Sequence, residues 1–200
     1  MKQPLGVILA GGLARRMGGG DKALLNLNGE TLLDHAIARL APQVGGLALN
    51  ANGDAVRFAR FGLPVLADSI PGFVGPLAGI LAGLDWAADQ GADSIVSAAV
   101  DTPFFPCDLV PQLLLASEGM ENPLVLAETT TGRHPTFGLW PVALRDDLRM
   151  ALKGGLRKVV QWTDAHGARA AHFSGPEDPF FNVNTPQDLE LACEIQKAKA

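Results

Sequence analysis

Cysteine is scarce in this sequence, and tyrosine does not occur in it. Cys107 and Cys193 stand far apart with no CxxC spacing, so the sequence indicates neither a disulfide framework nor a zinc site and favours a reducing compartment. Long apolar runs are missing too: the run 5–10 is too short for a signal peptide, and no stretch approaches the roughly 20 residues of a membrane span. We therefore expect a cytoplasmic protein with no membrane partner.

Charged residues are also sparse, at 18% of the chain, and the net charge is −5. An acidic chain lacks the broad basic surface that sequence-independent nucleic-acid binding requires, so no nucleic-acid partner is expected. A local basic pocket for an anion such as phosphate remains compatible with this balance. Apolar residues make up 48% of 200 residues, which excludes global disorder and predicts a single domain over residues 1–200.

Expected strands and helices alternate along the chain. Apolar runs predict strands at 5–10, 46–50, 64–67, 94–100, 124–127, 136–140 and 169–173. Helical spacing of apolar residues predicts helices at 31–40, 77–88, 108–116, 141–152 and 156–163, and Thr185-Pro186 opens a last helix. This alternation is typical of an α/β fold, a mostly parallel sheet with helices on both faces, in which ligands bind at the carboxyl ends of the strands.

A glycine-rich segment with three basic residues follows the first expected strand. Gly11 and Gly12 let backbone N–H groups approach a phosphate, and Arg15, Arg16 and Lys22 supply the cationic groups that a triphosphate needs. The formal GxGxxA match in this segment lies well beyond the strand end, and the lysine lacks the neighbours of a Walker A loop, so neither motif fits. A flexible surface turn is the structural alternative.

Polar residues also stand at three further expected strand ends. Asp101 follows the strand 94–100, where its carboxylate suits Mg²⁺, a cation that prefers hard oxygen ligands. Asn50, Asn52 and Asp68 offer amides and a carboxylate to ribose or base edges. The structural alternatives are a turn cap at Asp101 and local Asx turns at the other three positions.

Two other segments carry groups that suit a ligand. Asn182 and Asn184 flank Val183, so their amides face the same way in an extended segment, and edge-strand polar residues are the alternative reading. The run from Gly75 to Gly79 precedes a helix, and helix N-terminal N–H groups bind anions, although an ordinary helix entry would have the same sequence.

Taken in order, these segments resemble the pyrophosphorylase-like nucleotidyltransferases, and among them most closely the molybdenum cofactor guanylyltransferase family. The resemblance is carried by Leu9-Ala-Gly-Gly12, Arg16-Met-Gly18, Asp21-Lys22, Asn50-Ala-Asn52, Asp68, Gly75-Pro-Leu-Ala-Gly79, Asp101-Thr-Pro103, His134-Pro135 and Asn182-Val-Asn-Thr-Pro186. It spans essentially the whole chain and implies a Rossmann-like three-layer α/β/α nucleotidyltransferase fold. One departure is Ala99-Val100, where the family more often has Pro-Cys.

The resemblance also implies a reaction: GMP passes from GTP to the phosphate of molybdopterin, giving a dinucleotide cofactor and pyrophosphate, with Mg²⁺ as the metal. The N-terminal part then binds GTP and the C-terminal part mainly molybdopterin. Recipient molybdoenzymes and cofactor-assembly proteins are the implied protein partners. The implied roles are GTP binding by Leu9, Ala10, Gly11, Gly12, Lys22, Asn50, Asp68 and Asp101, metal binding by Asp101, and molybdopterin binding by Gly75, Gly79, Asn182 and Asn184.

We expect catalysis to rest on Arg16, Lys22 and Asp101, which would stabilise the charge that develops on the phosphates. No general base is expected, since a phosphate monoester is already an anion near pH 7, with a second pKa of about 6. The alternatives are a sister enzyme that uses CTP or another acceptor, and a non-catalytic nucleotide-binding chaperone of the same fold. A dehydrogenase is the weakest alternative.

Overall fold

A computed structural model of the chain describes residues 2–11, 20–70, 72, 75–175 and 178–199. Gly12, Arg15 and Arg16, which were predicted to bind phosphate, lie outside the described residues. Among the described residues, no helix is both long and apolar enough to cross a membrane.

A seven-stranded, mostly parallel sheet forms the centre of the molecule, in the strand order β5-β4-β1-β6-β8-β7-β9. β8 is antiparallel to its neighbours β6 and β7, and the other pairings are parallel. The strands are β1 (Leu5–Leu9), β4 (Leu47–Asn50), β5 (Val65–Leu66), β6 (Ser94–Ala99), β7 (Val125–Thr129), β8 (Gly132–Pro141) and β9 (Arg169–His172).

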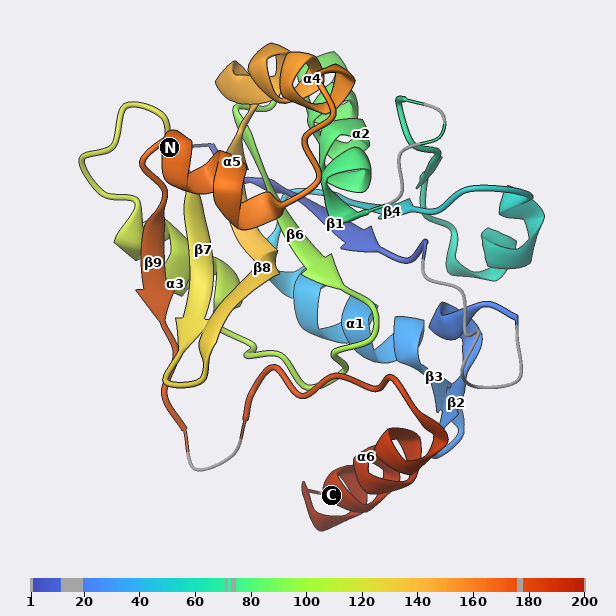
Figure 1. Cartoon of the computed structure of the whole chain (residues 1–200). Helices are drawn as coiled ribbons and strands as arrows, with labels where there is room; N and C mark the ends of the chain where they lie inside the picture. The colour runs from blue at the N-terminus through green and yellow to red at the C-terminus, as the bar shows by residue number, and fades with distance from the viewer. Residues whose placement is uncertain (1, 12–19, 71, 73–74, 176–177, 200) are drawn as a thin grey trace.

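Helices cover both faces of this sheet, which confirms the predicted three-layer α/β/α fold (Figure 1). α1 (Leu32–Leu40) and α3 (Leu109–Ala116) pack in one apolar core, and α2 (Pro76–Asp89), α4 (Arg145–Lys153) and α5 (Val159–Ala165) pack in the other. The sheet lies between the two cores. Its central strand β6 is therefore buried along its whole length, as expected for a strand covered by helices on both faces.

The structure differs from the sequence-based elements in several places. The strand expected at 136–140 begins at Gly132, the helix expected at 156–163 spans Val159–Ala165, and a 3-10 helix at Ala55–Phe61 was not predicted. The helix expected at 141–152 begins only at Arg145, because Pro141 ends β8 and a 3-10 helix (Val142–Leu144) intervenes. A small hairpin, β2 (Asn26–Leu27) and β3 (Glu30–Thr31), was not predicted. Its turn is Asn28-Gly29, with φ of 51° and 99°, the Asn-Gly combination that two-residue hairpin turns favour.

The carboxyl ends of the central parallel strands lie level with one another. Leu9 is in register with Asn50 on one side and with Ala99 on the other. Backbone hydrogen bonds continue past the strand ends, from Ala10 N to Asn50 O (2.9 Å) and from Val100 N to Leu9 O (3.2 Å). The polar residues that follow these strands therefore emerge at one edge of the sheet, where open α/β sheets bind ligands.

The chain returns to this edge near its C-terminus. Residues 178–185, which lead to α6 (Pro186–Lys199), run past the carboxyl edge of the sheet, and α6 lies beside the β2–β3 hairpin (Figure 1). Val183, which is fully buried, donates its N–H to the carbonyl of Asp101 (2.8 Å) and so fixes the segment at the end of β6.

Candidate active site

A buried lysine lies at the centre of the candidate site. Lys22 is only 8% exposed, and its ammonium is 2.7 Å from Oδ2 of Asp101 and 2.6 Å from Oδ1 of Asn184. These three side chains come from the glycine-rich segment, the end of β6 and the start of α6. Sequence elements that are remote from one another thus meet at a single cation, and all three residues were predicted site residues.

The Asn182 side chain belongs to the same cluster. Thr102 donates its hydroxyl to Oδ1 of Asn182 (2.7 Å) and lies 3.4 Å from Oδ1 of Asp101. Val183 points into the core between the two asparagines, as expected for an extended segment whose alternate residues face one way.

A capping box at the start of α6 fixes the backbone of Asn184. The carboxylate of Asp188 accepts the N–H groups of Asn184 and Thr185, each at 2.8 Å, and the Thr185 hydroxyl accepts the N–H of Asp188 (3.2 Å). These hydrogen bonds, led by the one from the Asn184 backbone, lower the pKa of Asp188 below its ordinary value, and the positive charge of Lys22 acts in the same direction.

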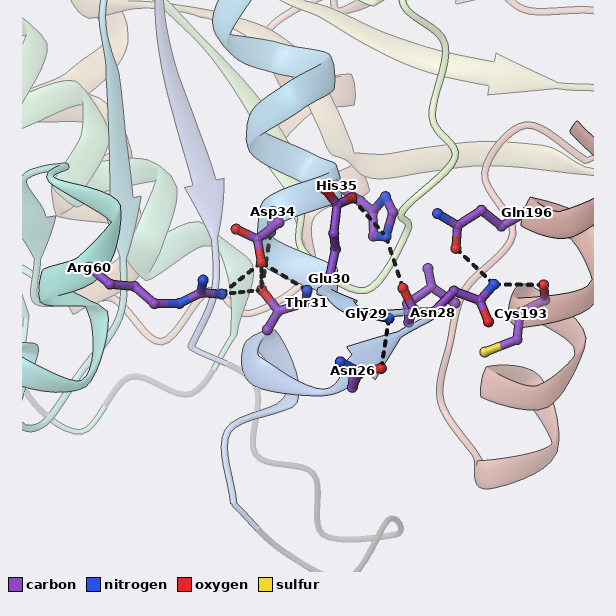
Figure 2. A network of polar contacts seen from close by, with 11 residues as sticks. Asn26, Asn28, Gly29, Glu30, Thr31, Asp34, His35, Arg60, Cys193 and Gln196 are labelled. Carbon is purple, nitrogen blue, oxygen red and sulfur yellow. Dashed lines mark hydrogen bonds and ion pairs between the residues drawn. The ribbon is translucent and has the colours of Figure 1, made fainter. Parts of the chain in front are cut away.

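A second contact joins the lysine segment to α6. The side-chain amide of Asn28, in the β2–β3 turn, donates to the carbonyl of Cys193 (2.9 Å) and to Oε1 of Gln196 (3.0 Å), as Figure 2 shows. The hairpin begins at Asn26, just after the 3-10 helix that contains Lys22, and Cys193 lies two turns beyond the start of α6. The contact between Lys22 and Asn184 is therefore supported on both segments by neighbouring structure.

A second polar group lies at the ends of β4 and β5. Asn50, which is 6% exposed, donates its side-chain amide to the Leu66 carbonyl (3.1 Å) and to Oδ1 of Asp68 (3.0 Å). Asn52 donates to Oδ2 of Asp68 (2.9 Å) and accepts the Asp68 backbone N–H (2.9 Å). These residues bond one another across two loops, so their contacts differ from the local Asx turns considered as an alternative.

Gly79 leaves the space that Asn50 occupies. A Cβ at this position of α2 would lie 2.1 Å from Oδ1 of Asn50 and 2.9 Å from Cδ2 of Leu9. The residue was predicted to contact molybdopterin, and the structure places it against the Asn50–Asp68 group. Gly75 is the N-cap of α2 with φ 144°, a conformation that side chains rarely adopt.

The described site residues thus form two groups on one sheet edge. Lys22, Asp101, Asn182 and Asn184 make one, and Asn50, Asp68 and Gly79 make the other; Leu9, Ala10 and Gly11, at the end of β1, lie between β4 and β6. Four residues that were not predicted as site residues also border these groups: Asp21, Arg57, Thr102 and Asp188. Only Asp188 had a clear signal, the Thr185-x-x-Asp spacing of a capping box.

His134 was assigned no chemistry and lies at the same edge, where β8 passes β7. Its ring stacks on Phe180, with centroids 4.3 Å apart, and Nε2 is 2.9 Å from the Thr129 hydroxyl. Burial lowers the pKa of His134 below 6.5, against a smaller opposing effect of Asp178, so the folded protein favours the neutral ring.

The chemistry of the lysine cluster suits a cation bound by oxygen. The Lys22 ammonium already lies between a carboxylate oxygen and an amide oxygen, which are the hard donors that Mg²⁺ and Mn²⁺ accept. Within the described ranges, no group of three or more His, Cys, Asp and Glu side chains is arranged to bind a metal ion. The donor set therefore fits a metal that takes one or two protein oxygens and completes its shell with substrate phosphates and water.

Comparisons with known proteins point to one family. Residues 6–170 match the family model described as the MobA-like NTP transferase domain. A curated relative from Bradyrhizobium sp. (strain ORS 278), named molybdenum cofactor guanylyltransferase, is 53% identical over 191 residues, which cover 94% of this chain and 90% of the relative.

Solved structures share the fold. Molybdopterin-guanine dinucleotide biosynthesis protein A from Archaeoglobus fulgidus superposes with a TM-score of 0.76 at 24% identity, covering 97% of this chain and 99% of that one. A Mycobacterium tuberculosis H37Rv protein, solved as a complex with manganese, has a TM-score of 0.68 at 18% identity and covers 96% of this chain and 99% of its own. At these identities the likeness concerns the fold alone.

Proposed function

We propose that this chain, which belongs to the MobA-like NTP transferase family, transfers GMP from GTP to the phosphate of molybdopterin and releases pyrophosphate. The observation that carries the proposal is the cluster of Lys22, Asp101 and Asn184 at the carboxyl edge of the sheet, in a chain about half identical to curated guanylyltransferases. A chaperone that only bound a nucleotide would have less need of a buried lysine paired with a carboxylate at this edge.

The reaction is a displacement at phosphorus. An oxygen of the molybdopterin phosphate bonds to the α-phosphorus of GTP, the bond from that phosphorus to the bridging oxygen breaks, and pyrophosphate leaves with the bridging oxygen. The attacking monoester is already anionic near pH 7, with a second pKa of about 6, so no side chain has to remove a proton. Catalysis then depends on orientation and on neutralising the phosphates.

Each part of the site has a proposed task in this reaction. Lys22 neutralises the phosphate chain, with Arg16 and the N–H groups from Leu9 to Gly12 as its proposed companions. Asn50 and Asp68 bind the nucleoside. Gly75, Gly79, Asn182 and Asn184 are proposed to contact molybdopterin, which divides the single domain 1–200 into a GTP-binding N-terminal part and a mainly molybdopterin-binding C-terminal part.

We propose Mg²⁺ as the metal and Asp101 as its protein ligand, with the side-chain oxygen of Asn184 beside it. A bound divalent cation would supply charge stabilisation to the transferring phosphoryl group. The manganese complex of the Mycobacterium tuberculosis protein supports a divalent metal in this fold. Because the Lys22 ammonium contacts Asp101 directly, the same carboxylate is shared between the lysine and the proposed ion.

The setting of the reaction is part of the proposal. We place the enzyme in the cytoplasm, where Cys107 and Cys193 stay reduced, as both are free in the structure. The product would pass to recipient molybdoenzymes, with transient contacts to cofactor-assembly proteins.

A mass spectrum of the product tests the proposal. The purified chain is mixed with molybdopterin, Mg²⁺ and, in parallel, GTP, CTP, ATP or UTP, and pyrophosphate release is followed. The expected result is a molybdopterin–guanine dinucleotide formed from GTP in preference to the other nucleotides. A cytosine product would identify the sister enzyme, and binding of GTP without any product would favour the non-catalytic alternative.

A further inference from the structure

We propose that Arg57 is a positioning residue that acts through Asp21, tying the backbone of Lys22 to the loop that follows β4. This inference rests on the proposed function, because it assigns the tie to the binding of GTP. Arg57 lies on a 3-10 helix (Ala55–Phe61) between β4 and β5, and Asp21 directly precedes the buried lysine.

The Arg57 guanidinium joins two separate segments. Its Nε is 2.6 Å from Oδ2 of Asp21, its Nη2 donates to the Asn52 carbonyl (2.6 Å), and its Nη1 donates to the Asp54 carbonyl. The side chains of Arg57 and Asp21 are only 25% and 19% exposed. The two Nη groups fix the planar guanidinium on the loop by hydrogen bonds, whereas the buried Nε meets Asp21 as an ion pair without a hydrogen bond. The positive charge opposite Asp21 is therefore held in one place, which a flexible lysine would not do.

The Asp21 side chain pairs with Arg57 instead of capping the helix that follows it. Asp21 is the N-cap of a short 3-10 helix (Lys22–Leu24), a position where an aspartate normally accepts a hydrogen bond from the helix N-terminus. Its side chain makes no cap hydrogen bond and instead contacts Arg57. The tie therefore acts on the backbone that carries Lys22.

The other end of the tie is the proposed nucleoside site. Asn52, whose carbonyl accepts from Arg57, pairs through its side chain with Asp68 in two hydrogen bonds of 2.9 Å. One guanidinium thus spans the distance between the side chains proposed for the nucleoside and the lysine proposed for the phosphates. GTP has to contact both at once, so its affinity depends on that separation.

Arg60 provides a matched control on the same 3-10 helix. It lies over the ring of Phe61 (4.1 Å) as Arg57 lies over that of Phe58 (4.6 Å). Its guanidinium donates to Oδ2 of Asp34 (2.7 Å) and to the Thr31 hydroxyl (3.1 Å), at the start of α1 (Figure 2). An Arg60→Ala variant therefore loses a comparable ion pair that does not involve Asp21 or Asn52.

The experiment compares GTP and guanosine binding by calorimetry in the wild type, Asp21→Ala, Arg57→Ala, the double variant and Arg60→Ala. Asp21→Ala changes GTP affinity in opposite directions under two explanations, a pure effect of net charge and a positioning effect on Lys22. If only net charge matters, removing a carboxylate near a triphosphate tightens GTP binding. If the tie positions Lys22, GTP binding weakens by about tenfold or more, while guanosine affinity stays within about twofold because Arg57 keeps its contact with Asn52.

The double variant tests whether the two residues act as one unit. We expect its loss of GTP affinity to be close to that of the larger single loss, since each substitution breaks the same tie, and Arg60→Ala to stay within about twofold of the wild type. Asp21→Asn and Arg57→Lys, which keep most of the shape, repeat the test should an alanine variant not fold, with smaller losses in the same direction.

Several outcomes would overturn the inference. Asp21→Ala would remove the positioning role if it bound GTP as tightly as the wild type or more tightly, or if it lost affinity for GTP and guanosine equally. Losses that multiply in the double variant would remove it as well. A wild-type chain that binds no GTP would instead refute the proposed function, and the positioning role with it, so the two failures are distinguishable.

Discussion

Asp101 is the residue on which the proposed chemistry depends most, because its carboxylate contacts Lys22 and is also the proposed metal ligand. Asp101→Asn keeps the size of the side chain, an oxygen that can accept from Lys22 and the backbone bond from Val183, so we expect the protein to fold. The melting temperature should fall, because the buried Lys22 ammonium loses its charged partner. Activity should fall by about 10²-fold or more, because the negative charge that a hard divalent cation requires is lost. Thermal unfolding measures the melting temperature, and steady-state rates measure the loss of activity. In a Mn²⁺ titration, excess metal should restore part of the rate.

Asp108→Asn is the control for this substitution. Asp108 is exposed at the start of α3 and makes no cap hydrogen bond, so its loss removes a carboxylate without disturbing the site. A fully active Asp101→Asn variant with unchanged metal dependence would show that the residue only caps a turn.

Gly79→Ala tests whether Asn50 is placed by the glycine. The new Cβ would lie 2.1 Å from Oδ1 of Asn50, so the asparagine must move and lose its contacts to Leu66 and Asp68. We expect GTP affinity, measured by calorimetry, to fall by about tenfold or more, with a stability loss of about 1–3 kcal/mol from overpacking.

The matched control is Gly83→Ala, one turn further along α2. Its Cβ would lie 2.7 Å from Cγ2 of Val7 and 2.9 Å from Cδ1 of Ile95, in the core and away from Asn50. This variant should lose stability to a similar degree and keep its GTP affinity. Equal affinity losses in both variants would assign the effect to the helix as a whole.

Single residues could be predicted where a strand end fixes their position. Asn50 ends a buried strand and Asp101 follows one, so their place at the sheet edge could be read from the sequence. Arg57 and Asp21 could not be predicted as a pair, because their contact depends on the path of a 3-10 helix and on an N-cap aspartate that turns away from its helix.

At the scale of elements, α6 positions the site through its first turn. Asp188→Ala removes the acceptor of the Asn184 and Thr185 N–H groups, so the helix start frays and the Asn184 amide no longer has a fixed place beside Lys22. We expect a stability loss of about 1 kcal/mol together with a loss of activity of about tenfold, measured by thermal unfolding and steady-state rates.

The capping box of α1 is the control for that of α6. Asp34 accepts the Thr31 N–H at 2.8 Å, as Asp188 does at its own helix, and it also pairs with Arg60, as Figure 2 shows. Asp34→Ala should therefore destabilise the protein at least as much and leave the activity per folded molecule close to that of the wild type. Equal activity losses in the two variants would show that α6 has no special role.

Elements were predictable where the local pattern decides the conformation. β1 and β6 are buried apolar runs, and α1 has apolar residues at helical spacing, so each was expected where it occurs. The predicted start of α4 was wrong because Pro141 is the last residue of a ten-residue strand. That strand is fixed by pairing with β6 and β7, which lie far away in the sequence. The β2–β3 hairpin had a signal in Asn28-Gly29, but its strands are too short for a clear alternating pattern.

At the scale of the whole molecule, alternation of strands and helices was enough to predict a mostly parallel three-layer fold. Two features lay beyond it. The antiparallel insertion of β8 between β6 and β7 follows from tertiary packing, and so does the return of the C-terminal segment to Lys22. A resemblance that spans the whole chain marked both Lys22 and Asn184 as expected site residues, whereas the contact between them became known only from the structure.

The pH dependence of stability is a property of the whole molecule to which His134 contributes. Burial lowers its pKa in the folded protein, so below about pH 6.5 the unfolded chain takes up a proton before the folded chain does. The contribution of His134 is therefore complete above the unfolded pKa and is lost as pH falls through that value toward the folded pKa. Asp34 and Asp188, whose pKa values are lowered from 3.8, lose their contributions only at lower pH and do not interfere.

His134→Gln tests this contribution, because glutamine keeps a polar group for Thr129 and does not titrate. Loss of the stacking on Phe180 should lower the free energy of unfolding at every pH, whereas the slope depends only on the titrating ring. Between pH 7.5 and 5.5 the wild type should lose more stability than the variant, so the two curves of unfolding free energy, measured by urea denaturation, should converge as pH falls. Parallel curves over this range would show that the ring takes up its proton equally in both states, and that burial of His134 has no influence on the pH dependence of stability.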